Sequence, residues 1–140
     1  MNSRRFALIL AVFLLWPWSI YGRDDGGPQY KAPPEIVAAL PKFCWWFYLD
    51  KVPNTPEYNI KDCGANSNHY CPGLVAMAQA ERQTDRKLRL ERLTRAKSDM
   101  EYTLRGTIDH PECSVRPPAK MHLERLKFQI EMLQLQMRKR

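Results

Sequence analysis

The chain has 140 residues, of which 44% are hydrophobic and 11% aromatic, and it carries a net charge of +7. This length accommodates one small domain with additional segments, and the hydrophobic fraction excludes a wholly disordered tail. Four cysteines and eleven prolines are unusual for a cytosolic helical protein, and this combination favours an oxidising compartment instead.

The N-terminus predicts a secretory signal peptide over residues 1–22. Two arginines precede an apolar run from Phe6 to Trp16, and a proline with small and polar residues follows. This is the order of charged, apolar and cleavage regions in a signal peptide. The run is shorter than the roughly 20 apolar residues of a membrane-spanning helix. We therefore expect cleavage after Gly22 and a periplasmic or secreted protein, with an uncleaved N-terminal anchor as the alternative.

Residues 23–42 predict a proline-rich linker that ends in one short helix, because two adjacent prolines initiate it and Pro41 stops it. Residues 43–50 then form the most apolar stretch of the exported part. We expect this aromatic lid (residues 43–50) to pack over the helices, held by a disulfide of Cys44. In the alternative, Trp45 and Trp46 contact a membrane interface, where such side chains are favoured.

Residues 51–70 are expected to be a loop, since proline, glycine and asparagine interrupt any regular pattern. The strongest helical signal follows, with helices predicted over about 72–82 and 85–105. Pro72 suits a first helical position, Thr84 or Asp85 a helix cap, and Gly106 a left-handed helix end. Apolar residues recur at intervals of three and four along one face of the second helix: Leu90, Leu93, Ala96, Met100 and Leu104. One bent helix is the alternative to two.

The two segments CPGLVAMAQAER and LRLERLTRAKSDMEYTL resemble the helices of a single tetratricopeptide repeat. Ala76 and Ala80 are the small residues of the first helix, and Ala96 with Met100 match the small and large positions of the second. No second copy appears at the period of about 34 residues. The resemblance implies a helical hairpin that contacts another protein.

The last predicted helix, residues 118–139, opens at a pair of prolines and is apolar on two faces. Its inner face has spacings of three and four: Leu123, Leu126, Ile130, Leu133 and Met137. On nearly the opposite side lie four further apolar residues, Met121, Phe128, Met132 and Leu135. We expect the inner face to pack on the preceding helix. The outer residues, together with Trp45 and Trp46, are the predicted interaction residues; internal filling of the outer face by the aromatic lid is the alternative.

All four cysteines lie in the predicted exported part, and an even number predicts two disulfides. Because a hairpin brings its entry and exit together, we favour Cys71–Cys113, which leaves Cys44–Cys63. A local Cys63–Cys71 bridge is the main rival. A metal is not predicted; the alternative metal site would use Cys63, Cys71, His110 and Cys113, although their spacing is looser than in usual zinc sites.

No sequence motif of a hydrolase, metalloprotease or phosphate-binding loop is present, so neither an enzyme nor a cofactor is predicted. A Cys–His pair, such as Cys71 with His69 or His110, would need an unpaired thiolate. Charge is concentrated in residues 82–140, which hold 15 basic and 8 acidic residues, or 15 − 8 = +7. In an exported protein this charge favours an acidic protein or a phospholipid surface over nucleic acid.

The sequence thus predicts a mainly α fold, in which residues 43–140 form a small helical domain. It comprises a helical hairpin and a long C-terminal helix, preceded by an irregular N-terminal region held by disulfides. The expected function is protein–protein interaction or assembly in a bacterial cell envelope, with an unknown envelope protein or a second copy as partner. A small-ligand or metal-binding envelope protein, and a protein associated with a membrane surface, are the alternatives.

Overall fold

The computed structural model describes residues 29–60 and 63–139. The predicted signal peptide and the first part of the predicted linker lie outside the described residues. The fold is mainly α, as predicted, and the described residues contain no strand. Its elements are α1 (Pro34–Val37), α2 (Lys42–Trp45), the 3₁₀ helices η1 (Pro56–Tyr58) and η2 (Ala65–His69), α3 (Tyr70–Arg82), α4 (Arg86–Gly106) and α5 (Arg116–Arg138).

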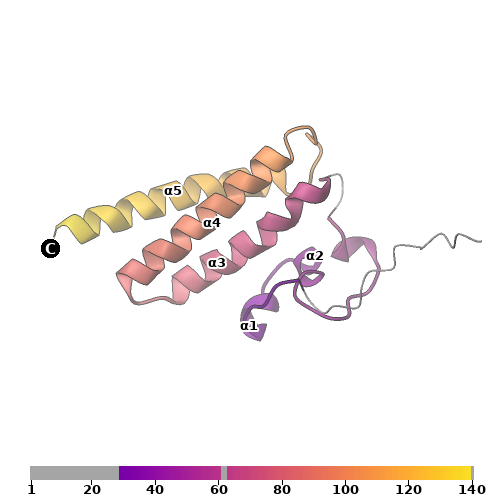
Figure 1. Cartoon of the computed structure of the whole chain (residues 1–140), viewed down its shortest axis with the longest axis horizontal. Helices are drawn as coiled ribbons and strands as arrows, with labels where there is room; N and C mark the ends of the chain where they lie inside the picture. Colours follow the sequence, from indigo (N-terminus) through magenta and orange to yellow (C-terminus); the bar gives the residue numbers. More distant parts are fainter. Residues whose placement is uncertain (1–28, 61–62, 140) are drawn as a thin grey trace, which may run out of the picture.

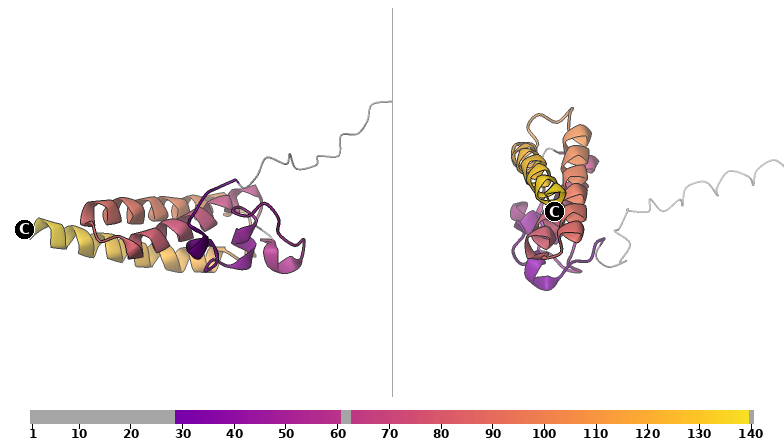
Figure 2. Two further views of the ribbon diagram at one scale, coloured as in Figure 1. Left: turned by 90° about the horizontal axis from the view of Figure 1, so that it is seen from below. Right: turned by 90° about the vertical axis from the view of Figure 1, so that its left-hand side faces the viewer.

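Helix α4 runs antiparallel to α3, and α5 runs antiparallel to α4. Helix α4 packs against both of the others (Figure 1). The short elements α1 and α2 lie beside α3. The C-terminal turns of α5 extend past the turn that joins α3 to α4, as two views show (Figures 1 and 2). No helix within the described ranges is both long and apolar enough to cross a membrane.

Helix α4 starts as predicted and ends differently. Asp85 caps it, and its side chain accepts a hydrogen bond of 2.9 Å from the Leu88 N–H. The prediction of a left-handed helix end at Gly106 is wrong, because the helix includes this glycine and is followed by Thr107 with φ −111°. The Arg116 guanidinium instead donates to the carbonyl oxygens of Leu104 and Thr107, at 3.0 and 2.7 Å, and so satisfies the C-terminal carbonyls.

The other long helices begin slightly before the predicted residues. Helix α3 starts at Tyr70, so Pro72 lies inside the first turn, where its missing N–H has no intrahelical partner to lose. Helix α5 starts at Arg116, and its two prolines occupy the first turn as expected. These differences of one or two residues leave the predicted faces unchanged.

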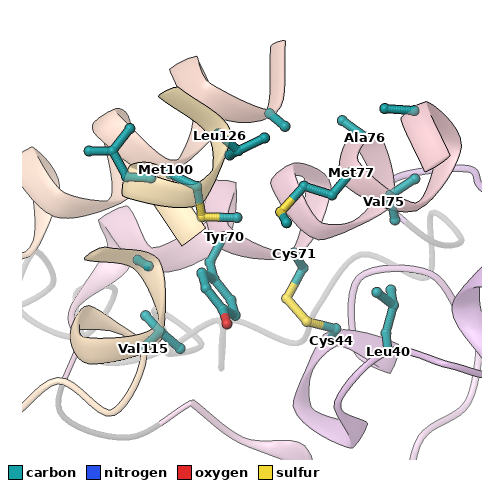
Figure 3. Close-up of a cluster of buried hydrophobic side chains, with 14 of the residues drawn as sticks. Leu40, Cys44, Tyr70, Cys71, Val75, Ala76, Met77, Met100, Val115 and Leu126 are labelled. Carbon is teal, nitrogen blue, oxygen red and sulfur yellow. A yellow bond between two sulfur atoms is a disulfide. The ribbon is translucent and has the colours of Figure 1, made fainter. Parts of the chain in front are cut away.

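The favoured disulfide pairing is wrong, and the local rival is wrong too. The bonds are Cys44–Cys71 and Cys63–Cys113, with Cα atoms 5.5 and 4.4 Å apart. The aromatic lid lies against the start of α3, which brings Cys44 to Cys71 (Figure 3). The segment before α3 meets the α4–α5 connection and places Cys63 beside Cys113. The two bonds indicate an oxidising environment.

A single buried core joins the lid to the three long helices. Met77 of α3 points toward Met100 of α4, with Leu126 of α5 nearby, whereas Cys71 points toward Cys44 of the lid (Figure 3). The predicted face of α4 is confirmed, with Leu93, Ala96 and Met100 buried and Leu90 and Leu104 partly buried. Close approach of α3 to α4 occurs at Gly73, where an added Cβ would lie 2.7 Å from Met100 Cε.

Candidate interaction surface on the last helix

Helix α5 has one buried and one exposed apolar face, as the spacing of its apolar residues predicts. Its inner face is buried at Ala119, Leu123, Leu126 and Leu133. The outer stripe is defined here as Met121, Phe128, Met132 and Leu135, whose residues are 62%, 64%, 41% and 42% exposed, respectively. Large apolar side chains at regular spacing in solvent are characteristic of an interaction surface. The outer stripe is therefore the candidate functional site.

Met137 departs from the predicted inner face. It is 38% exposed although its spacing places it in line with Leu126 and Leu133. The physical reason is the length of α5, whose last turns extend past the α3–α4 turn and have no helix opposite them (Figure 2). At its C-terminal end, the inner face of α5 therefore extends beyond the helices on which it packs.

The aromatic lid does not cover the outer stripe, so the alternative in which the lid fills this face is wrong. Phe43 stacks on Tyr70 at the start of α3, with ring centroids 6.1 Å apart. Tyr48 is buried, and Phe47 contacts Tyr30. Because these aromatic side chains pack around α3, they support the fold, as the lid prediction expects, and leave the stripe in solvent.

Trp45 and Trp46 are half-buried and lie apart from the outer stripe in the lid. The Trp45 ring packs against the core and lies 6.0 Å from the Tyr58 ring. The structure therefore does not bring these two predicted interaction residues together with the four of α5. Their role as a membrane contact remains a prediction.

An open apolar groove of about 300 Å³ lies between the α1–α2 segment, α3 and α5. Its walls include Leu40, Pro41, Leu74, Met77, Ala78 and His122. Burial, and secondarily Arg125, lowers the pKa of His122, so its neutral form is favoured. Its Nδ1 atom is buried without a hydrogen-bond partner in the chain. Burial also raises the pKa of the neighbouring Tyr70 to about 12. The groove is thus mainly apolar, and its polar groups include the His122 imidazole and the Glu81 carboxylate, which pairs with Arg125 at 3.1 Å.

A polar contact also joins the segment before α3 to α4. His69 Nδ1 lies 2.9 Å from Asp99 Oδ1, and the His69 ring lies 4.0 Å from the Tyr102 ring. Sequence reasoning missed this pair because the partners are 30 residues apart and no local pattern links them. All four cysteines are in disulfides, so neither His69 nor His110 has the thiolate that the Cys–His alternative requires.

The alternative metal site is not assembled. Cys71 belongs to one disulfide and Cys63 with Cys113 to the other, and a disulfide sulfur is not a thiolate ligand. His110 lies beside Gly64, where an added Cβ would be 2.8 Å from His110 Nε2. Over the part of the chain that the structure describes, no group of three or more His, Cys, Asp or Glu residues is arranged to hold a metal ion.

No protein-family model, curated protein or solved structure matches this chain. The chain's own geometry, above all the outer stripe of α5, is thus the basis on which a function is inferred.

Proposed function

We propose that this protein is an exported interaction or assembly factor of the cell envelope, and that the outer stripe of α5 is its contact face. The observation that carries the proposal is Phe128, a large apolar side chain that is 64% exposed on a helix whose opposite face is buried. Aromatic residues and methionine are enriched at protein–protein interfaces. Helical anchors at spacings of three, four and seven residues are a common way to bind another helix.

The helix that carries the stripe is held in place before any partner binds. Leu123, Leu126 and Leu133 anchor its inner face, and the Arg116 guanidinium bonds its first turn to the end of α4. A preordered helix loses little conformational entropy on binding, which favours recognition. The resemblance of the α3–α4 hairpin to a tetratricopeptide repeat adds support for a protein partner.

The N-terminal sequence and the cysteines support export of the protein. A charged and then apolar segment precedes a domain in which every cysteine is oxidised. The periplasm of a bacterium and the space outside the cell both allow such bonds to persist.

The test is photo-crosslinking in the living cell from position 128, with a photoreactive phenylalanine derivative in place of Phe128. Ile108 is the matched control, because it is 69% exposed and apolar but lies in the α4–α5 connection. We expect a discrete covalent product from position 128 and none from position 108. If position 128 reacts only within its own chain, the contact face is not on the outer stripe.

The groove beside His122 supports a second candidate, binding of a small apolar ligand. Its volume of about 300 Å³ is at the lower end of small-molecule sites. N-phenylnaphthylamine, an apolar fluorescent probe, should bind the wild type and lose affinity at least about tenfold in Ala78→Trp, which fills the groove. Equal binding by both proteins would rule out this site.

A further inference from the structure

We propose that the outer stripe binds a second copy of this chain, with the two α5 helices packed antiparallel. This inference rests on the proposed function, in which the stripe is a contact face, and names the partner. Met121, Phe128 and Leu135 are seven residues apart, and Met132 follows Phe128 by four. A seven-residue apolar repeat is the pattern by which helices pair along their length. The inner face is already used within the chain, so this repeat is left for another molecule.

The repeat matches itself when the second helix is reversed. With the two-fold axis midway between Phe128 and Met132, each Phe128 packs on Met132 of the second copy. Leu135 then lies opposite Arg125 of the second copy and Met121 opposite Lys139, so the aliphatic stems of these two cations cover the apolar side chains. From Met121 to Leu135 the stripe spans about 21 Å of helix, at about 1.5 Å per residue. The same patch thus meets itself across a closed two-fold interface, the commonest arrangement of soluble oligomers.

Charge selects the antiparallel direction over the parallel one. Seven-residue spacing places Arg125 and Lys139 in line with Met132 along the stripe. In a parallel pair each of these cations would lie opposite its own copy, and like charges there oppose pairing. In the antiparallel pair, Glu124 lies beside Arg138 of the second copy, and this attraction occurs twice. Glu131 of the two copies lies near the axis, and the repulsion between these two carboxylates is offset by the two Glu124–Arg138 attractions. Within each chain, Lys127 pairs with Glu124 at 2.8 Å.

The mixed charge beside the stripe also favours a second copy over a uniformly acidic partner. Glu124 and Glu131 flank the apolar residues and are both exposed. An acidic helix or an anionic membrane would attract cations beside the stripe such as Arg125 and Lys127, but it would also place negative charge against both glutamates. The net charge of +7 opposes self-association only weakly, because salt screens charges more than about 8 Å apart at physiological ionic strength.

Sedimentation velocity of the purified, oxidised protein tests the inference. We expect a concentration-dependent dimer whose dissociation constant rises at least about tenfold in Phe128→Glu, while Ile108→Glu dimerises as the wild type does. Circular dichroism of each variant verifies that the helices are intact. A dimer that persists in Phe128→Glu would place the interface elsewhere and overturn the proposal.

A charge exchange tests the antiparallel register. Glu124→Lys and Arg138→Glu should each weaken the homodimer, since each variant places like charges side by side. Mixing the two variants should restore dimers, because the lysine introduced at position 124 then meets the glutamate introduced at position 138. The unchanged Arg138 of the first variant likewise meets the unchanged Glu124 of the second. If the mixture associates no better than either variant alone, the antiparallel pairing is wrong.

Two further outcomes separate this inference from the proposed function. A protein that stays monomeric while position 128 captures a different protein in the cell would overturn the dimer and retain the contact face. A monomer that sediments with vesicles containing anionic phospholipid, and does so through Phe128, would replace the dimer with a membrane surface. A position 128 that reacts only within its own chain would remove both proposals.

Discussion

Cys44 of α2 and Cys71 of α3 form a buried disulfide that fastens the aromatic lid to the first turn of α3. The described segment before α3 contains only short helices, whose hydrogen bonds alone do not hold them. The lid therefore depends on this bond and on the packing of Phe43 and Tyr48. The second bond, Cys63–Cys113, fastens the segment before α3 to the α4–α5 connection.

Replacing both Cys44 and Cys71 with serine is expected to lower the free energy of unfolding by about 2–4 kcal/mol, as for loops of this size. Removing Cys63 and Cys113 should cost slightly more, because the sequence separation is 50 rather than 27 residues. Urea unfolding followed by tryptophan fluorescence measures both. Equal stability of the wild type and the Cys44/Cys71 variant would show that packing alone holds the lid.

Shortening a side chain to alanine should affect stability differently on the two faces of α5. Leu126→Ala removes a fully buried side chain and is expected to cost about 2–5 kcal/mol. Phe128→Ala alters an exposed side chain and should change monomer stability by less than about 0.5 kcal/mol. Thermal unfolding at low protein concentration compares them. A large loss of monomer stability in Phe128→Ala would mean that the outer stripe packs within the chain.

The free energy of unfolding should decrease as the pH falls, because His122 becomes protonated. Burial lowers its folded-state pKa below the ordinary value of 6.5, so the unfolded chain binds this proton more readily than the folded one. The contribution is intact above about pH 6.5 and is lost as the pH falls through the folded pKa. His122→Gln should therefore flatten the decline in stability between about pH 7.5 and about pH 5. Parallel curves for wild type and variant would contradict this assignment.

Gly64 should resist substitution for two separable reasons. Its φ of +61° with ψ of −173° suits glycine alone, and an added Cβ would lie 2.8 Å from His110 Nε2. Gly64→Ala is expected to cost about 1–3 kcal/mol through backbone strain, plus the steric contact. The double variant Gly64→Ala/His110→Ala should recover only the steric part. Complete recovery would show that the backbone at Gly64 is not strained.

The sequence predicted the elements that depend on local patterns. Asp85 caps α4 because its carboxylate reaches its own first turn, and the two faces of α5 follow from spacing alone. Contacts between distant segments were not predictable in this way. The partner of Cys71 depends on where the lid folds back, and the end of α4 depends on Arg116 from the next helix. The His69–Asp99 contact has the same origin, since neither residue stands in a local motif.

A photo-crosslinking scan of α5 in the cell determines whether the outer stripe of this helix contacts a protein. A photoreactive residue is placed in turn at Lys127, Phe128, Met132, Gln134 and Leu135, all exposed in the structure. We expect intermolecular products to peak at positions 128, 132 and 135, which have the helical spacing of one face. Equal yields at every position, or a peak at positions 127 and 134, would contradict this prediction.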